Sequence, residues 1–367
     1  MMNSTQPVEY SADGDAVVYC AGAYQTPNGK TAHGLVRFTQ RYRVRAVIDP
    51  SLAGQDAGDL LDGRATGVPI VADLRTALQL LPAQQDEPRY FVVGIAPDGG
   101  AASQMIRNAV KEALEAGLHV DSGLHSFFSE DPELQRLAAL SGVSIRDVRK
   151  TPPRSELHSF TGRITEVNSL KIAILGTDSA IGKRTTAWKL TAALRQEGLS
   201  CEMIGTGQTA WMQGVRYGII LDSLINDFIP GELEHAILNA WGEQRPDVMV
   251  IEGQGSLMNP AYPGGFEILA AGRPDMVVLQ HAPSRKEYDG FPGFALHPLD
   301  QQIRAIELIS GRPVVAVAIN HEGISLDRVP ELCRSIANET ALLVFDPVLQ
   351  GAGAMIPIIR AELSRRA

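Results

Sequence analysis

The chain has 367 residues, enough for two domains that each bury a core. Hydrophobic residues make up 44% and charged residues 20%, which excludes a wholly disordered protein, and no apolar run approaches the ~20 residues that span a bilayer. The net charge of -9 disfavours non-specific binding to nucleic acid, and 3 Cys without CxxC spacing disfavour a disulfide framework or a zinc site.

The first half alternates short apolar runs with helical patterns. Residues 1–15 are polar and lack the apolar segment of a signal peptide, so we expect a cytoplasmic protein. Strands are predicted at 16–20, 44–48, 90–95 and 119–121, and helices at 73–81, 101–116 and 132–140. This alternation predicts an α/β domain over residues 1–150 with a Rossmann-like, doubly wound parallel sheet.

Residues 151–168, rich in Pro and polar residues, are predicted to be a linker. A second α/β domain follows at 169–367. Its strands are predicted at 171–175, 201–204, 217–221, 248–251, 276–279, 314–319 and 342–345, and its helices at 183–196, 231–241, 299–310 and 326–337. The sequence therefore predicts two α/β domains in tandem, the second with a P-loop NTPase-like parallel sheet.

A glycine-rich segment, residues 176–186 (GTDSAIGKRTT), joins the first strand and first helix of this second domain. A glycine turn followed by a helix N-terminus binds phosphate, because backbone N–H groups and the helix dipole point at the ligand. The common pattern GxxxxGK[ST] has four residues between its glycines, whereas here there are five, and Arg184 follows Lys183. The predicted phosphate-binding residues are Gly176, Thr177, Asp178, Ser179, Ile181, Gly182, Lys183, Arg184, Thr185 and Thr186.

Other strand ends of the second domain supply polar residues for the same site. Glu252 ends an apolar strand in VMVIEGQGS and has two roles open to it, ligand of Mg²⁺ or general base. Gln208, in the segment GTGQT, is predicted to line the same site. If the site uses Mg²⁺, we expect Thr185, Asp222 and Glu252 as ligands, although helix capping explains Asp222 equally well.

These motifs resemble the dethiobiotin synthetase-like branch of the P-loop proteins, whose GTDTxxGKT loop also has five residues between its glycines. Nearly the whole chain resembles a narrower family, long described as a domain of unknown function and now named for a D-glutamate N-acetyltransferase that uses acetyl-CoA. The segments that carry this resemblance are GAYQTPNGKTAHGLVR, VIDPSLAGQDAGDLLDG, SGLHSFFSEDPEL, DVRKTP, GTDSAIGKRTTA, GTGQT and EGQGS.

The resemblance implies that the loop binds the phosphates of coenzyme A, and Arg184 suits such contacts. The candidates for the base that deprotonates the acceptor amine are Glu252, His33 and His125, although a structural role explains each His at least as well. Lys30, at a Gly-Lys-Thr that opens a helical pattern, is a second anion-binding candidate. Arg285, Gln254 and Lys30 are predicted to bind the acceptor, although a solvated loop explains Arg285 as well.

The first hypothesis is therefore an acetyl-CoA-dependent N-acetyltransferase that acts on an amino acid, D-glutamate being the acceptor that the resemblance implies. The alternative is an ATP- and Mg²⁺-dependent ligase or kinase of the dethiobiotin synthetase type, and a third class is a nucleotide-binding regulator without turnover. The expected partner is a small-molecule amino acid, with no nucleic acid and no membrane, and the expected assembly is a homo-oligomer.

Overall fold

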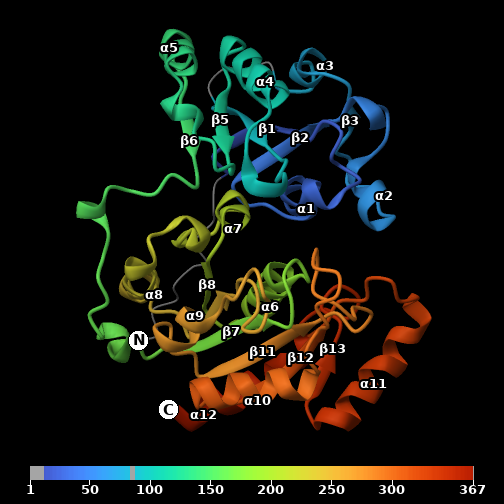
Figure 1. The fold of residues 1–367 in the computed structure, drawn as a ribbon, viewed down its shortest axis with the longest axis vertical. Helices are drawn as coiled ribbons and strands as arrows, with labels where there is room; N and C mark the ends of the chain where they lie inside the picture. The colour runs from blue at the N-terminus through green and yellow to red at the C-terminus, as the bar shows by residue number, and fades with distance from the viewer. Residues whose placement is uncertain (1–11, 83–86, 367) are drawn as a thin grey trace. The chain divides into compact units, whose positions relative to one another are not determined.

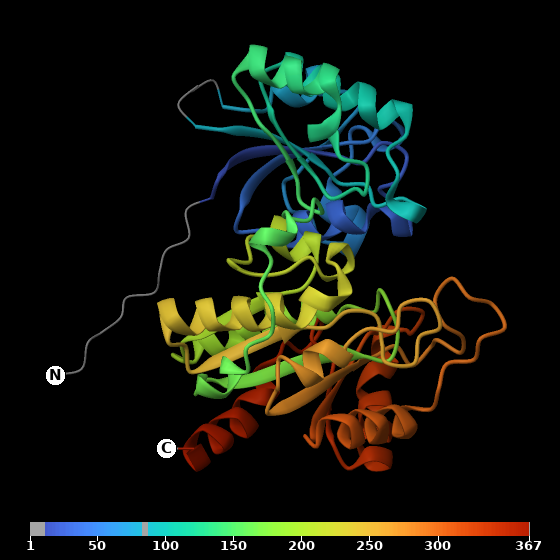
Figure 2. The ribbon, with the colours of Figure 1, turned by 60° about the vertical axis from the view of Figure 1, so that its left-hand side comes forward.

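The protein divides into two compact units, shown as ribbons in Figures 1 and 2. The structure is a computed structural model and describes residues 12–82 and 87–366. One unit comprises Met1–Thr151 with Gln208–Val215, and the other comprises Pro152–Gly207 with Arg216–Ala367. The prediction that the chain begins without a signal peptide falls largely on residues 1–11, which lie outside the described residues.

The first unit is a six-stranded parallel sheet with the strand order β3-β2-β1-β4-β5-β6. This order is that of a Rossmann fold, in which the chain reverses direction across the sheet beside the first strand. The strands are β1 (Gly14–Tyr19), β2 (Tyr42–Ile48), β3 (Ile70–Val71), β4 (Arg89–Val93), β5 (His119–Ser122) and β6 (Ile145–Asp147). The helices are α1 (Lys30–Arg37), α2 (Ala57–Asp62), α3 (Leu74–Leu78), α4 (Gln104–Glu115), α5 (Pro132–Ser141) and α7 (Gln208–Met212).

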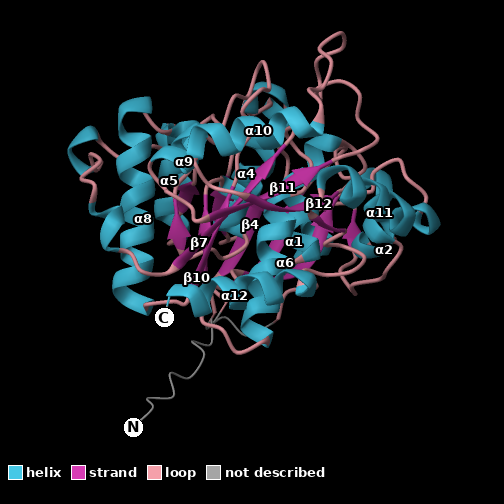
Figure 3. Ribbon diagram, turned by 90° about the horizontal axis from the view of Figure 1, so that it is seen from below, coloured by secondary structure: helices cyan, strands magenta, loops and turns pink. Residues whose placement is uncertain are grey.

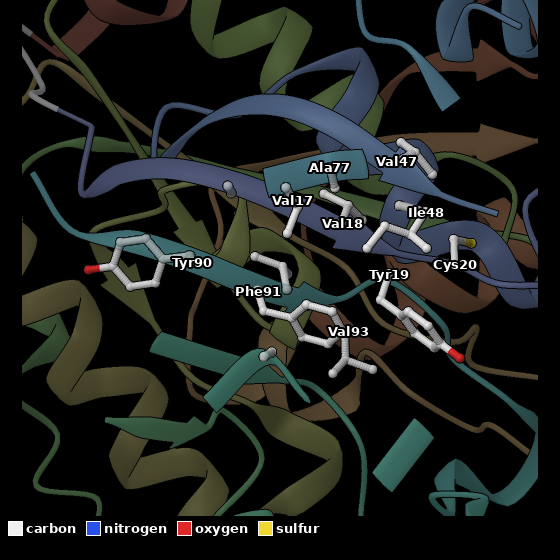
Figure 4. Close-up of a cluster of buried hydrophobic side chains, with 14 of the residues drawn as sticks. Val17, Val18, Tyr19, Cys20, Val47, Ile48, Ala77, Tyr90, Phe91 and Val93 are labelled. Atoms are coloured by element: carbon white, nitrogen blue, oxygen red, sulfur yellow. The ribbon is translucent and has the colours of Figure 1, made fainter. Parts of the chain in front are cut away.

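The core of this unit forms around β1, which lies between β2 and β4. Figure 4 shows Val17 and Val18 of β1 beside Val47 of β2 and Phe91 of β4, all of them fully buried. Burial on both faces explains why these strands are continuous apolar runs, the pattern expected of a parallel sheet covered by helices. In Figures 1 and 2, α4 and α5 lie on one face of the sheet and α1 on the other.

Helix α7 completes this first unit although the chain reaches it directly from β8 of the second. Met212 is fully buried in the first unit's core. The Gln213 Nε2 donates hydrogen bonds to the carbonyl oxygens of Gly34 (2.8 Å) and Phe38 (2.9 Å). The guanidinium of Arg41 stacks 3.9 Å from the centre of the Trp211 ring and donates to the Trp211 carbonyl oxygen at 2.8 Å. A short segment of sequence is thus fixed by apolar, hydrogen-bonding and cation–π contacts together.

The second unit is a seven-stranded parallel sheet with the order β13-β12-β11-β7-β10-β8-β9. Its strands are β7 (Leu170–Gly176), β8 (Cys201–Gly205), β9 (Tyr217–Gly218), β10 (Val248–Glu252), β11 (Met276–His281), β12 (Val314–Ile319) and β13 (Leu343–Phe345). Its helices are α6 (Lys183–Gln196), α8 (Ile229–Gln244), α9 (Phe266–Ala270), α10 (Leu299–Ser310), α11 (Val329–Thr340) and α12 (Ile356–Arg366).

Helices cover both faces of this sheet, as Figure 3 shows. Residues of α8, α9 and α10 share a buried cluster with alternate residues of β7, β10 and β11, among them Ala173, Ile251 and Val277. Helix α6 packs against β7, β8 and β10. The carboxyl ends of β11, β7, β10 and β8 therefore meet at one edge, with β7 between β11 and β10.

The segment from Pro152 to Ser169 runs as short turns instead of a strand or an α-helix, with 3-10 turns at Arg154–Glu156 and Arg163–Glu166. The buried carboxylate of Glu234 in α8 fixes it. This carboxylate accepts hydrogen bonds from the Thr161 backbone N–H at 2.6 Å, the Thr161 hydroxyl at 2.8 Å and the Ile164 N–H at 3.0 Å. Among the described residues, no helix has the length and hydrophobicity needed to cross a membrane.

The predicted strands of the first half are confirmed to within two residues at each end, and α6 and α10 occupy the residues predicted for them. The strand predicted at 217–221 is wrong beyond Gly218. There the Leu221 N–H donates to the Thr206 carbonyl oxygen, and the chain turns into the 3-10 segment Leu221–Ser223.

Candidate functional site

The loop between β7 and α6 folds tightly around the start of α6, and two glycines make this possible. Gly182, the residue before α6, has φ of 101°, in the left-handed region that favours glycine. At Gly176 an added Cβ would lie 2.8 Å from Cδ of Lys183 and 3.1 Å from the Asp178 carbonyl oxygen. Any side chain at position 176 would therefore force the Lys183 side chain to shift.

Lys183 begins α6 and turns its ammonium group into the loop. The side chain is 7% exposed, and Nζ donates a hydrogen bond to the Asp178 carbonyl oxygen at 2.7 Å. Burial lowers the pKa of Lys183 to about 8, although the carboxylates of Asp178 and Glu252 oppose the change. A buried ammonium group beside the free N–H groups at the start of a helix favours phosphate binding, because both the ammonium and the helix dipole attract an anion.

Asp178 holds the loop in shape from a fully buried position. Its carboxylate accepts hydrogen bonds from the Ser179 N–H (2.7 Å) and Asn259 Nδ2 (2.9 Å) on one oxygen, and from Arg285 Nη1 (2.7 Å) and the Asp289 N–H (3.0 Å) on the other. The four donors come from the loop itself and from the segments after β10 and β11, so this one side chain ties three segments together.

On the β11 side, two neighbouring polar residues support the loop. The carbonyl oxygen of Gln280 accepts the Thr177 N–H at 2.9 Å, and its side-chain oxygen accepts the hydroxyl of Thr186. The next residue, His281, lies 3.0 Å from the Thr177 hydroxyl through Nδ1. Burial lowers the pKa of His281 to about 4, so its ring is neutral near neutral pH.

On the β10 side, Glu252 ends the strand next to β7 and is 3% exposed. One carboxylate oxygen accepts the Thr206 N–H at 2.8 Å, while the Thr206 hydroxyl donates to the Glu252 carbonyl oxygen at 3.0 Å. Gln254 Nε2 in turn donates to the Thr206 hydroxyl at 3.1 Å. Burial raises the pKa of the Glu252 carboxyl, against the opposing effects of Arg184, the Thr206 N–H and Lys183. The structure therefore brings Lys183 and Arg184 into electrostatic reach of Glu252.

Four of the predicted site residues, His33, His125, Lys30 and Gln208, belong to the first unit. His33 of α1 donates from Nε2 to the Tyr24 carbonyl oxygen at 2.5 Å, and burial lowers its pKa. His125 is exposed and follows β5, and Lys30 is exposed at the start of α1. Gln208 is buried at the start of α7. Their predicted roles stay predictions.

Arg285 and the expected Mg²⁺ ligands have surroundings that the sequence does not reveal. The guanidinium of Arg285 binds Asp178, the Ser179 carbonyl oxygen (2.9 Å) and Glu322. This geometry favours support of the loop, and the predicted contact with an acceptor stays a prediction. Asp222 is exposed in the 3-10 turn Leu221–Ser223, whereas Glu252 is buried. Within residues 12–82 and 87–366 no three His, Cys, Asp or Glu side chains are grouped so as to hold a metal ion.

Several supporting residues escape sequence reasoning. Asn259 reaches Asp178 from a loop with no motif of its own, and Asn320 Nδ2 donates to the Ile181 carbonyl oxygen at 3.1 Å. Gln280 was detectable in principle, because a polar residue near the carboxyl end of a buried strand lies at the ligand edge of a parallel sheet.

The fold and this site define a class: a P-loop protein with a second, Rossmann-like unit. A parallel sheet, a glycine-rich loop after its central strand and a buried lysine opening the next helix are the defining features. The chain belongs to the DUF1611 family, since the model described as "Domain of unknown function (DUF1611_C) P-loop domain" matches residues 158–356 and the "DUF1611_N Rossmann-like domain" model matches residues 50–151. The predicted family resemblance and fold class are both confirmed.

Two relatives carry the name D-glutamate N-acetyltransferase. The one from Tritonibacter scottomollicae is 26% identical over 293 residues, covering 78% of this chain and 85% of the relative. The one from Pseudoalteromonas sp. is 27% identical over 275 residues, covering 73% and 80%. The crystal structure of a DUF1611 family protein from Anabaena variabilis superimposes with a TM-score of 0.86 at 29% identity, covering 95% of this chain and 99% of that one.

Proposed function

We propose that the protein is an acetyl-CoA-dependent N-acetyltransferase whose acceptor is the amino group of an amino acid, with D-glutamate the first acceptor to test. The observation that carries the proposal is a buried carboxyl, Glu252, beside a phosphate loop that presents both Lys183 and Arg184. The two relatives named D-glutamate N-acetyltransferase support the reaction class and the acceptor.

The phosphate loop supports coenzyme A as the ligand. Coenzyme A carries a pyrophosphate and a further phosphate, and these anions match a buried ammonium, a guanidinium and the N–H groups at the start of α6. The planar guanidinium of Arg184 suits two parallel hydrogen bonds to one phosphate better than an ammonium does.

Glu252 supplies the proton acceptor that the chemistry needs. An amino acid carries an ammonium group at neutral pH, and only the free amine forms a bond to the thioester carbonyl carbon. The base first takes one proton from the ammonium group. The new N–C bond then replaces the C–S bond, and the nitrogen loses a second proton, which ends on the sulfur as coenzyme A leaves as its thiol. A carboxyl whose pKa is raised by burial is a stronger base than an exposed one, which suits Glu252 to this role.

A turnover panel tests the proposal. The purified protein is mixed with acetyl-CoA and each of a set of D- and L-amino acids, and both the free thiol and the mass of the acetylated product are measured. We expect activity with D-glutamate, and Glu252→Gln lowers kcat by roughly 10²- to 10⁴-fold, the usual range for loss of a general base. Glu331→Gln, on the exposed side of α11, is the matched control. Thiol release that no amino acid stimulates contradicts the proposal.

The P-loop class also fits the alternative, an ATP- and Mg²⁺-dependent ligase or kinase of the dethiobiotin synthetase type. In that case Thr185, Asp222 and Glu252 would have to supply the Mg²⁺ ligands. ATP hydrolysis that is lost in Lys183→Ala, in a protein that does not bind acetyl-CoA, replaces the first proposal with this one.

A further inference from the structure

Phosphate loops of this class commonly bind Mg²⁺ together with their phosphate ligand. In the GxxxxGK[ST] pattern the hydroxyl that follows the lysine binds Mg²⁺. Mg²⁺ requires oxygen ligands in octahedral geometry, usually one or two carboxylates together with phosphate and water. Here the residue after Lys183 is Arg184, whose guanidinium has five N–H donors and no acceptor atom. The position that normally ligates the ion holds a group that cannot ligate it.

The two threonines that follow do not restore the missing ligand. Successive residues of an α-helix point roughly 100° apart around its axis, so Thr185 leaves α6 in a different direction from Arg184. Thr186 is fully buried, and its hydroxyl donates to the side-chain oxygen of Gln280 on the β11 side of the loop. Glu252 lies on the opposite side, at the end of β10.

Arg184 instead provides positive charge at Glu252. Of the cations that stabilise the Glu252 carboxylate, Arg184 contributes most and Lys183 next. The Thr206 N–H and hydroxyl hold Glu252 at the end of its strand, so the carboxylate stays within reach of both. A divalent cation placed at Glu252 would meet two like charges, and this repulsion disfavours its binding. The residues present do not fit Mg²⁺.

We propose that the Arg184 guanidinium takes the place that a divalent cation occupies in related phosphate loops, so that this loop binds the phosphates of its ligand without Mg²⁺. The guanidinium then neutralises phosphate charge while it stays within electrostatic reach of Glu252. The identity of the ligand, coenzyme A, rests on the proposed function, whereas the independence from metal rests on Arg184 and Glu252.

Calorimetric titration with two phosphate ligands, acetyl-CoA and ADP, tests this inference. Each is titrated into the wild-type protein in excess EDTA and again in excess MgCl₂. We expect at least one of them to bind in EDTA with a Kd within about threefold of that in MgCl₂, a difference of less than 1 kcal/mol. Arg184→Thr recreates the usual Lys-Thr order. We expect this variant to bind roughly 10- to 100-fold more weakly in EDTA, as for loss of a charge-assisted hydrogen bond, and to recover part of its affinity with Mg²⁺.

Matched variants assign the effect to this one position. Lys189→Thr removes a cation further along α6 and is expected to bind as the wild type does in both solutions. Lys183→Ala is expected to lose binding in both, which places the ligand at the loop. Melting curves check that each variant folds, and Arg184→Lys provides a second substitution if Arg184→Thr does not fold. The comparison of EDTA with MgCl₂ on the wild-type protein needs no variant at all.

The possible outcomes separate the two proposals. Wild-type binding that requires Mg²⁺ for both ligands overturns the inference, as does an Arg184→Thr variant with unchanged affinity in EDTA. Metal-independent binding of ADP without any binding of acetyl-CoA supports the role of Arg184 and contradicts the proposed function. Failure of both ligands to bind in either solution overturns both proposals.

Discussion

At the scale of single residues, Asp178 determines whether the phosphate loop keeps its shape. Its buried carboxylate accepts four hydrogen bonds, one of them from the Arg285 guanidinium, whose side chain is only 15% exposed. Removing one partner of a buried ion pair is costly because the other charge stays buried without compensation. The loop and the segments after β10 and β11 therefore depend on this one side chain.

We expect Asp178→Ala to lower the free energy of unfolding by about 3 kcal/mol, because the buried ion pair is broken and the Asn259 amide loses an acceptor. The cost stays at the low end of the range for buried ion pairs because Arg285 keeps its contact with Glu322. Chemical denaturation monitored by circular dichroism measures the change. Asp327→Ala, at an exposed position before α11, is the control and should change stability by less than about 0.5 kcal/mol. Equal stability of the two variants would show that the loop does not need this carboxylate.

The pKa of Lys183 predicts how ligand affinity depends on pH. In the free protein burial lowers this pKa to about 8. A bound phosphate favours the ammonium form, so binding takes up a proton above that pH and the affinity for acetyl-CoA falls as pH rises, by up to about tenfold per pH unit. Below this value Lys183 is already protonated and contributes no pH dependence. Calorimetric titration over roughly pH 6.5–9.5 measures the effect.

Lys183→Arg is the control for this pH dependence, because arginine stays protonated throughout the range. Its affinity is expected to be independent of pH above 8. A wild-type affinity that is equally constant up to the most alkaline sample would contradict a protonation change at Lys183.

The contiguous part of the site was predictable from sequence, and the supporting part was not. Gly176, Gly182 and Lys183 lie in one segment, so their spacing alone predicts a phosphate loop. Asn259 and Arg285 reach the same loop from distant parts of the chain, and no local pattern encodes a hydrogen bond between them and Asp178. Electrostatic effects such as the buried ammonium of Lys183 follow from the packed structure and not from residue type.

At the scale of secondary-structure elements, α7 shows how a short helix is stabilised by its surroundings. Helices this short are marginal by themselves, so tertiary contacts must hold them. The segment GTGQT predicts that Gln208 lines the site but gives no sign of a helix, because five residues are too few to show an apolar period. Helix α9 and the edge strand β3 are likewise too short to show a periodic pattern in the sequence. Longer elements such as α6 carry their period clearly and were predicted correctly.

We expect Met212→Ala to destabilise the first unit by about 2–5 kcal/mol, the usual cost of emptying a buried site of this size. Met212 is fully buried in that unit's core. Met105→Ala on α4 is the matched control, because Met105 is 60% exposed. Denaturant unfolding of both variants measures the difference. Similar denaturation midpoints for the two variants would mean that Met212 of α7 does not stabilise the core.

At the scale of the whole molecule, the two units are not two consecutive pieces of sequence. The first unit is made of Met1–Thr151 and Gln208–Val215, so a cut between the sequence halves removes part of its core. It also removes the Gln213 amide that satisfies the carbonyl oxygens of Gly34 and Phe38 at the end of α1. A cut at the predicted linker, residues 151–168, therefore breaks core contacts that the composition of the linker does not reveal.

A fragment that ends at Thr151 is thus expected to be less stable than the same unit in the full chain. A synthetic peptide covering residues 207–216 should bind the fragment and raise its melting temperature, because a ligand that binds only the folded form stabilises it. A peptide with Ala in place of both Trp211 and Met212 is the control. If the fragment has the same melting temperature with the wild-type peptide, with the control peptide and without peptide, a structural role for α7 is contradicted.

The path of the chain through the first unit also affects its synthesis. The polypeptide leaves this unit at Pro152 and returns only at Gln208, after the phosphate loop and α6 have been made. Domains generally fold as units while the ribosome is still translating, starting from the N-terminus. Here the first sheet emerges from the ribosome well before α7. The apolar residues that Met212 covers therefore stay exposed in the nascent chain. During that interval the growing chain is a natural substrate for chaperones, and truncated products of translation are prone to aggregate.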